Sequence, residues 1–473
     1  MSAGANPKDM SWGRRGSVLV IVLWIAFGLV SLALYFANAM NFELRASDNR
    51  VCAKAADEAI EGAARYINYL LTQQVANGSN GVFLTLSDSL CQGVPVGQAR
   101  YWLIGRDTNN PVGPGQLSFG LVDEASKLNL NTAASNALIW LPRMTVDLTQ
   151  AILDWRDTNG TGPTVTYYAM QQPSYQCKCD PFETVDELRL LYGADMDTLV
   201  GEDANHNGIL DPSETDDNQN GMLDPGVLEY VTVYSREPNT NSDGSAKVNI
   251  SSVTSGTSPL SSLLQTNFGN ARATEILGNL GLVSLGPSRG SAGNGRNSPA
   301  PAPAAATVRF SSPLQLYVTS KMTETEFALI ASNLTTTNGS YIIGRVNINT
   351  ASAAVLACLL GGDLGAAQQL VTYRQSNPNN LTSIAWINDA LGQSYPDDLQ
   401  ALEAGDYITT QSYQFTADIA AVGPYGRGYR RVKYIFDTSS GTPAIVYRQD
   451  LSHLGWALGK EVRQNLLLAK DSP

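Results

Sequence analysis

Histidine is the scarcest ionisable residue in this sequence of 473 residues, which contains only His206 and His453. A serine or cysteine nucleophile usually depends on a histidine base, so the sequence offers almost no bases for a hydrolytic site of that kind. No glycine-rich phosphate loop followed by lysine is present either. The sequence therefore predicts a protein that is not an enzyme.

Cysteine is also scarce, with five in the chain, and an odd count leaves at least one unpaired. Cys177 and Cys179 are separated by one residue, and no spacing typical of a zinc site occurs. In an exported protein one or two disulfides fit these numbers, but the spacing does not give the pairing.

Basic residues are outnumbered, with 31 lysines and arginines against 43 acids and a formal net charge of −12. Such a field repels polyphosphates, so we expect no nucleic-acid partner. Apolar residues make up 43% of the chain, which is enough for packed cores. The length predicts about two to four folded units.

One hydrophobic run stands out, from 17 to 37, where 21 residues carry no charge. As a helix it is long enough to cross the hydrocarbon core of a membrane. Arg14 and Arg15 directly before it favour a cytoplasmic N-terminus by the positive-inside rule. We therefore expect a single-pass membrane protein whose body lies outside the cytoplasm, a location that the family resemblance given below implies to be the inner membrane and the periplasm.

The run fits three interpretations: a secretory signal cleaved at 37–39, an uncleaved anchor, or a prepilin-type signal. The polar leader that ends in Arg-Gly resembles the third kind, in which a peptidase cuts after Gly16 and the new terminus, Ser17, is methylated. Apolar residues continue at helical spacing beyond the run, which predicts one helix over 17–74. Those residues are Phe42, Ala46, Ala55, Ala56, Ile60, Ala63, Ile67 and Leu70.

Ile21 occupies the fifth position after the expected cleavage site, where most pilins and pseudopilins carry glutamate. An apolar residue here resembles the type II secretion system protein K family. The resemblance implies a minor pseudopilin at the tip of the periplasmic pseudopilus that starts or caps its assembly. It also implies the prepilin peptidase, the major pseudopilin and other minor pseudopilins as partners.

An internal repeat relates residues 128–133, LNLNTA, to residues 346–351, VNINTA. Each copy predicts a helix starting at Asn-Thr-Ala, with Asn131 or Thr132 (Asn349 or Thr350) as N-cap, a turn and a second helix. Third helices are expected at 184–191 and 384–391. These units resemble helix-hairpin-helix or SAM-like modules, which protein K also contains.

A membrane-anchored DNA receptor of the competence type is the alternative function, because it carries similar modules. Its DNA-binding hairpin presents Gly-x-Gly amides to a phosphate, with basic residues nearby. Here the first hairpin is Leu-Pro-Arg-Met-Thr at 141–145, and the second places Asp363 after two glycines. Neither keeps the phosphate-binding arrangement.

Two acidic loops follow each other between residues 203 and 227 and predict two calcium sites. The ligand positions of the first loop are Asp203, Asn205, Asn207, Ile209, Asp211 and Glu214, and Gly208 provides the sharp turn. The second loop offers Asp216, Asn218, Asn220, Met222 and Asp224, but its twelfth position is Val227, so Glu229 or Glu214 would have to reach across. The alternative is a solvated turn rich in asparagine and glycine. The resemblance to protein K also implies calcium binding, because protein K binds calcium in this inserted region.

Strands are expected at 101–106, 116–122, 228–235 and 246–250, and an alternating pattern near the C-terminus predicts a meander. The predicted fold is α+β: a pilin-like long helix packed on an antiparallel sheet that inserted helical modules interrupt. The expected layout is a leader at 1–16, the membrane part of the helix at 17–39, the pilin-like helix and first strands at 40–123, a helical module with the calcium loops at 124–284, a linker rich in Pro, Gly, Ser and Ala at 285–307, a second helical module at 308–405, and the closing strands at 406–473.

Overall fold

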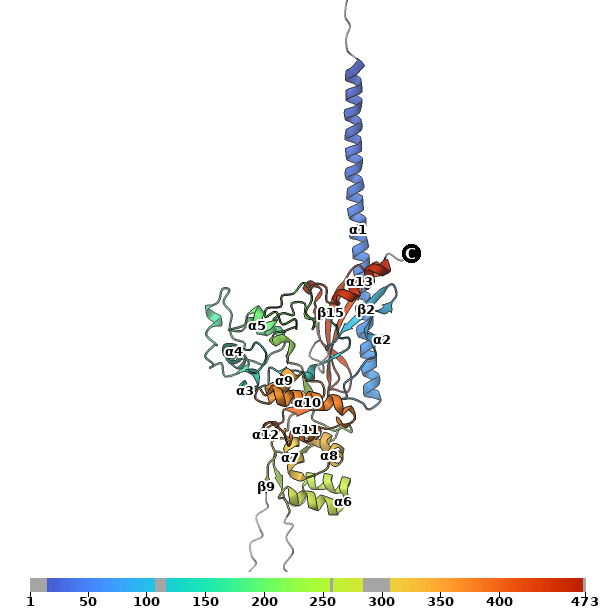
Figure 1. Ribbon diagram of the computed structural model, residues 1–473. Helices are drawn as coiled ribbons and strands as arrows, with labels where there is room; N and C mark the ends of the chain where they lie inside the picture. The colour runs from blue at the N-terminus through green and yellow to red at the C-terminus, as the bar shows by residue number, and fades with distance from the viewer. Residues whose placement is uncertain (1–14, 107–115, 256–257, 284–306, 471–473) are drawn as a thin grey trace, which may run out of the picture.

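The computed structural model describes residues 15–106, 116–255, 258–283 and 307–470. Its dominant element is helix α1, Arg15–Ala76, which projects from the body as one continuous rod (Figure 1). The first half of α1 is exposed along its apolar run, and the second half packs on the body. The helix expected over 17–74 is thus confirmed. The leader lies outside the described residues apart from its last two.

The pilin-like sheet has six strands, and every pair is antiparallel. Its strands are β1 (Val94–Val96), β2 (Ala99–Ile104), β14 (Gln414–Val422), β15 (Arg430–Asp437) and β16 (Ala444–Asp450) in that order, with β3 (Val122–Asp123) beside β14. Because β2 pairs directly with β14, early and late parts of the chain join in one sheet. This confirms the predicted fold class.

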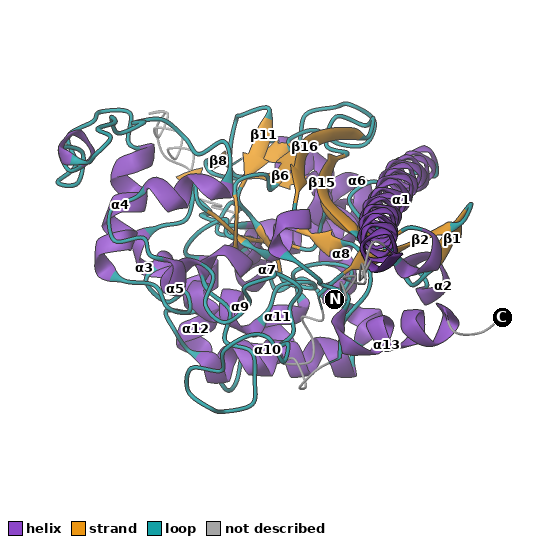
Figure 2. Ribbon diagram, turned by 90° about the horizontal axis from the view of Figure 1, so that it is seen from above, coloured by secondary structure: helices purple, strands orange, loops and turns teal. Residues whose placement is uncertain are grey.

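Helix α1 lies against one face of the sheet, and the inserted helices between residues 135 and 199 lie on the other side (Figure 2). Ala56, Ala59 and Ala63 are buried where α1 meets the strands. Small side chains at helical spacing let the helix axis approach the sheet closely. Phe415 and Tyr434 are among the large residues that fill this core.

The inserted region supplies short helices and two-stranded pairs. The helices described there are α3 (Ser135–Leu138), α4 (Val146–Arg156), α5 (Met196–Leu199), α6 (Pro259–Asn279), α7 (Pro313–Ser320), α8 (Glu324–Ile330), α9 (Ala353–Leu359), α10 (Leu364–Ser376), α11 (Trp386–Leu391) and α12 (Pro396–Glu403). Outside it lie α2 (Asp88–Cys91) and the C-terminal α13 (Gly459–Lys470).

Five strand pairs tie the insert together. They are β4 (Leu128–Asn129) with β5 (Val231–Thr232), β6 (Arg236–Pro238) with β11 (Tyr341–Ile343), β7 (Val248–Asn249) with β10 (Leu334–Thr335), β8 (Val253–Thr254) with β9 (Thr307–Val308), and β12 (Val346–Asn347) with β13 (Ile408–Thr409). Buried apolar residues from Leu128 to Ile408 form one continuous core. The two modules therefore pack together around a single interior.

The internal repeat is also a repeat in three dimensions. Arg156 at the end of α4 donates to the carbonyls of Leu130 and Ala133. Arg374 in α10 donates in the same way to the carbonyls at the corresponding positions of the second copy, at 2.9 and 2.7 Å. β4 and β12, which open the two copies, each pair in parallel with a later strand. One arginine thus closes each copy on its own first loop.

The predicted N-caps were wrong. The first helix of each copy starts later, with Ala134 and Ser352 as the N-cap residues. Asn131 instead accepts a hydrogen bond from the amide of Phe182 at 2.7 Å and donates to its carbonyl at 3.0 Å. Its amide is committed to the segment before the third helix, so it is not free to cap the first.

Other elements differ in extent from their predictions. The third helix of the first copy is a 3₁₀ helix, Val185–Leu190, whereas the second copy has an α-helix at Trp386–Leu391. Of the strand expected at 116–122, only Val122 pairs in a strand, while Phe119 forms an isolated bridge to Ile104. Nearly all of the predicted linker, residues 285–306, lies outside the described residues.

Candidate metal centre and its docking surface

The N-terminal residues singled out by the sequence lie in one helix. Gly16 and Ser17 both belong to α1, near its start. The side chain of Ile21 is 57% exposed and sits in the apolar stretch of the helix. Helix α1 is the one helix in the described part of the chain that is long and apolar enough to cross a membrane.

The first acidic loop is folded around the carboxylate of Asp203. This carboxylate accepts hydrogen bonds from the backbone amides of Asn207 and Gly208, both at 2.9 Å. Gly208 has φ of +82°, and a Cβ there would lie 2.9 Å from the side chain of Arg106. Glycine is required at this position by both the left-handed backbone and the close approach.

Four further predicted ligand positions of the first loop are joined by hydrogen bonds. Glu214 accepts from the backbone amides of Asn205 and Asp211, at 3.1 and 2.9 Å. The side-chain amides of Asn205 and Asn207 donate to one oxygen of Asp211, at 2.7 and 2.9 Å. Carboxylates and amides at alternate positions thus face one another across a short loop.

One atom in this loop has no partner. Asn205 is 6% exposed, and its Oδ1 is buried without a hydrogen bond. A buried carbonyl oxygen left unpaired is costly, and an amide oxygen is a typical ligand of Ca²⁺. The residues present therefore fit a bound calcium ion. In the described part of the chain no three His, Cys, Asp or Glu side chains form a ready cluster, so amide and carbonyl oxygens would have to contribute.

The second loop repeats the hydrogen-bond pattern of the first loop, at positions that lie thirteen residues later in the sequence. Asp216 accepts from the backbone amides of Asn220 and Gly221, at 3.2 and 2.8 Å. The side chains of Asn218 and Asn220 donate to one oxygen of Asp224, at 2.5 and 3.0 Å. The second loop thus has the same backbone design, but its side chains are more exposed to solvent.

The carboxylate that the second loop lacks is supplied by Glu202. Its two oxygens accept from the backbone amides of Asp217 and Asp224, both at 2.8 Å. Glu214 bridges the first loop in nearly the same way, and its contact to Asp211 corresponds to the contact of Glu202 to Asp224. Glu202 is 4% exposed. It stands in the place of a bidentate twelfth ligand.

The sequence pattern did not identify Glu202, because Glu229 and Glu214 were the carboxylates expected to complete the second loop. Glu229 does not reach across, since it forms an ion pair with Arg106 at 2.6 Å. Glu214 is already engaged by the first loop. The sequence does contain a signal for this role, because Glu202 directly precedes the first loop. After two adjacent turns the chain can return to the start of the first loop, which brings the second loop beside Glu202.

The first loop docks onto the sheet through the buried guanidinium of Arg431. Arg431 donates to both oxygens of Asp418, at 2.8 and 2.5 Å, within the sheet. It also donates to the backbone carbonyls of Asn205 and His206, the latter at 2.6 Å. One side chain therefore joins two strands to the loop.

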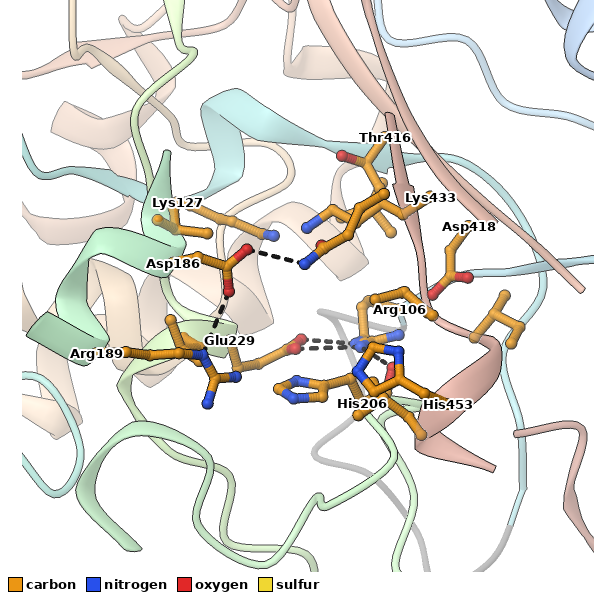
Figure 3. A pocket seen from close by; sticks show the side chains of 17 residues that line it. Arg106, Lys127, Asp186, Arg189, His206, Glu229, Thr416, Asp418, Lys433 and His453 are labelled. Carbon is orange, nitrogen blue, oxygen red and sulfur yellow. Dashed lines mark hydrogen bonds and ion pairs between the residues drawn. The ribbon is translucent and has the colours of Figure 1, made fainter. Parts of the chain in front are cut away.

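Arg106 supports the same contact from the end of β2 (Figure 3). It donates to the carbonyl of His206 at 3.0 Å and forms two hydrogen bonds to Glu229, at 2.6 and 3.1 Å. Burial alone would raise the pKa of Glu229, but the guanidinium of Arg106 holds it below its usual range. The pair stays charged beneath the loop.

The C-terminal segment covers the other side of the loop. The side-chain amide of Asn205 donates to the carbonyl of Trp456 at 3.4 Å, and that of Asn207 donates to the carbonyl of Ala457 at 3.2 Å. The loop is therefore held between the sheet and the segment that leads into α13.

Residues of the two hairpins of the repeat contact other parts of the protein. Arg143 of the first hairpin forms ion pairs with Asp197 and with Asp217, the latter at 3.5 Å. Gly362 of the second hairpin faces the ring of Trp140 so closely that a Cβ would lie 2.5 Å from it. Asp363 caps α10. The hairpins are committed to contacts within the protein.

The second module, which includes α9 to α12, matches a family model over residues 346–404. That model describes protein K of the type II secretion system. Residues 346–404 of this chain are therefore similar to protein K of the type II secretion system. This match supports the role of a minor pseudopilin, and the long N-terminal helix and antiparallel sheet agree with it.

The other comparisons add little to the protein K assignment. A solved complex of GspK, GspI and GspJ from the type 2 secretion system of enterotoxigenic Escherichia coli is 10% identical in sequence. The match covers 86% of this chain and 99% of that chain, with a TM-score of 0.38. No curated protein matches this sequence. Nothing favours a DNA receptor.

Proposed function

We propose that this chain is a minor pseudopilin that occupies the tip of the pseudopilus and starts or caps its assembly. The observation that carries the proposal is the position of the insert. Helices α6, α7, α8 and α12 lie beyond the end of α1 that is remote from the anchor (Figure 1). A subunit stacked on that end would meet these helices instead of a free pilin surface.

Ile21 supports the same placement from inside the membrane segment. A glutamate here would need a partner in the lipid, because an unpaired charge is costly there. An apolar residue needs none, which suits a subunit with no neighbour above it. The proposal includes cleavage between Gly16 and Ser17 by a prepilin peptidase, methylation of Ser17, an inner-membrane helix and a periplasmic body.

The proposed partners are other minor pseudopilins, with the major pseudopilin below them. The test is to co-express the full chain with the other minor pseudopilins of the same organism and to purify the proteins in detergent. We expect a stable complex, and an epitope at Gly244 should label only one end of extended pseudopili. Label distributed along the fibre would exclude the tip position. Mass spectrometry of the mature N-terminus should find methylated Ser17, and a chain that starts at Met1 would exclude processing.

We also propose that the two acidic loops bind two calcium ions as a structural clamp. The unpaired Oδ1 of Asn205 supports the first site, and the position of Glu202 supports the second. Without cations the carboxylates of the loops repel one another, so binding would order the segment and stabilise the fold. Asn205 and Asn207 would turn their amide oxygens toward the ion.

Calorimetric titration of the decalcified protein tests the clamp. Wild type should bind two equivalents of calcium, and Glu202→Gln should weaken one of them by at least about tenfold, because one bidentate carboxylate is lost. Asp203→Asn should weaken the other site. Glu183→Gln is the matched control, since Glu183 is exposed and lies outside both loops. Unchanged affinity in Glu202→Gln would remove this residue from the site.

A further inference from the structure

The two cysteines of the first module lie together on the segment that follows α4. Cys177 and Cys179 are separated by only one residue, and the thiol of Cys177 is free. It also faces the carbonyl of Asp154 at 3.7 Å. The sulfur of Cys179 lies over Gly160, where a Cβ would approach it to 3.4 Å. Both thiols therefore face the turn at the end of α4.

The residue between them is fixed in a different direction. The ammonium of Lys178 contacts Glu187 at 3.1 Å and Glu183 at 3.4 Å. Glu187 in turn accepts from the indole of Trp155 at 2.9 Å. Because Lys178 is tied to this cluster, the segment holds its two thiols on one side as a pair.

The backbone around the pair favours a tight closure. Cys179 has φ of +47°, a left-handed conformation that non-glycine residues adopt mainly in sharp turns. The next residue, Asp180, donates its amide to the carbonyl of Trp155 at 3.1 Å. This left-handed conformation sets the direction of the Cβ of Cys179, and residues two apart in the sequence can lie within the Cα separations that a disulfide spans.

We propose that Cys177 and Cys179 form a reversible Cys-Lys-Cys disulfide. Both side chains are partly exposed, whereas the other three cysteines are buried. A bridge across so short a loop removes little chain entropy, so it adds little stability. Exposed bridges of this kind exchange readily and have more oxidising potentials than structural ones. The pair is therefore a site of redox modification, not a structural crosslink.

The chemistry needs a disulfide donor, such as glutathione disulfide or an oxidoreductase that carries a disulfide. The thiolate of Cys179 attacks one donor sulfur, forms a mixed disulfide and releases the other donor sulfur as a thiol. Cys177 then loses its proton and attacks the sulfur of Cys179, which releases the second donor thiol. Two thiols of the chain are oxidised, and one donor disulfide is reduced.

Burial raises the pKa of Cys177 to about 11, and Cys179 adds to the effect. Cys177 is therefore mostly protonated at neutral pH, which makes it the second thiol to react. The proposed disulfide does not depend on this order, because it rests on the spacing and the partial exposure of the two thiols.

The test uses the purified full chain in detergent, equilibrated in buffers with different ratios of glutathione to glutathione disulfide. Samples are quenched in acid, unfolded, alkylated and analysed by peptide mass spectrometry. We expect the peptide with Cys177 and Cys179 to become two hydrogens lighter and to escape alkylation as the ratio falls. Cys358→Ser, which removes a buried cysteine elsewhere, should leave this behaviour unchanged.

Cys177→Ser gives a second readout that does not depend on the bridge. It should leave Cys179 as a stable mixed disulfide with glutathione, because the resolving thiol is gone. Alkylation of both thiols at every ratio, or pairing of either with another cysteine, would overturn the proposal.

The occurrence of the bridge in cells rests on the proposed periplasmic body, because that compartment is oxidising. Alkylation of thiols in whole cells distinguishes the redox proposal from the proposed periplasmic location. A pair that oxidises in vitro but is reduced in cells supports the redox site and contradicts the location. A pair that stays reduced in vitro overturns the redox site itself.

Discussion

At the scale of single residues, Arg431 has the greatest influence on how the protein is assembled. It is fully buried, and its ion pair with Asp418 lies on the sheet face opposite α1. Its remaining donors go to backbone carbonyls of the first acidic loop. Satisfied in this way, a buried guanidinium fixes one relative position of the sheet and the loop.

Arg431→Met should destabilise the protein by about 3 to 5 kcal/mol, because Asp418 would remain buried without its counter-charge. Chemical denaturation followed by circular dichroism measures this loss. Arg448→Met is the control, since the side chain of Arg448 is 55% exposed and its pair with Glu61 spans 3.8 Å. That variant should lose at most about 1 kcal/mol. Equal losses in the two variants would contradict the central role of Arg431.

At the scale of secondary-structure elements, the two hairpins of the repeat meet each other. Gly362, between α9 and α10, lies against the ring of Trp140, which follows α3. The neighbouring Gly361 has nothing within 4 Å of its Cβ position. Both glycines have positive φ, +94° and +64°. Substitutions at the two glycines therefore distinguish two costs in stability. Backbone strain affects both positions, whereas overlap with Trp140 affects only Gly362.

Gly361→Ala should cost about 1 kcal/mol from the left-handed backbone alone. Gly362→Ala should cost about 1 to 3 kcal/mol more, because its methyl group would overlap the indole. Thermal unfolding of both variants gives the difference. In the background Trp140→Ala the extra cost should disappear, and its persistence would show that the hairpins are not in contact.

The carboxylate of Glu326 joins helix α8 to helix α6, and its ionisation affects the stability of the protein. Glu326 accepts two hydrogen bonds from Arg272, at 2.9 and 3.0 Å, and one from the backbone amide of Thr323 at 2.8 Å. The hydrogen bonds from Arg272 and from Thr323 lower the pKa of Glu326 to about 2. Its ionised form is therefore favoured by folding.

The stability that Glu326 contributes is present above its unfolded pKa, near 4.5, and is lost as the pH falls toward 2. Glu326→Gln should be less stable than wild type by about 1 kcal/mol at pH 7. The gap should narrow as the pH decreases below 4.5. Denaturation at several pH values measures it, and a gap that widens in acid would reverse the sign of this argument.

At the scale of the whole molecule, the first acidic loop connects three parts of the chain: the insert, the sheet and the segment before α13. If the loops hold calcium, its removal should affect all three. Bound ligand at one hundred times its dissociation constant stabilises a protein by about 2.7 kcal/mol. The clamp should therefore contribute measurably to global stability.

Chelation should lower the melting temperature and speed amide exchange at 203–224 and 451–458, because these segments contact each other. Exchange in α10 and α11 should change little, since the hydrogen bonds that hold the first loop come from the sheet and from the segment before α13. Excess magnesium in place of calcium is the control. Faster exchange throughout the insert, without effect on 451–458, would contradict the docking of the loop on the C-terminal segment.

The sequence by itself determined the long helix, the paired ends of the sheet, the repeat and the positions of the acidic loops. These features depend on local periodicity and spacing, which a single chain displays directly. The alternation of Phe415, Ala417 and Ile419 was enough to predict a strand with one face against a core. Even the family could be suggested, because the leader and Ile21 are local signals.

Only the tertiary structure decided what covers the second face of the sheet. Thr416 and Asp418 alternate with those apolar residues and are buried as well, because the insert folds back over them. The role of Glu202 and the pairing of Arg431 with a distant loop arose in the same way. Such contacts join residues far apart in the sequence, and no local pattern records which buried charge will find which partner.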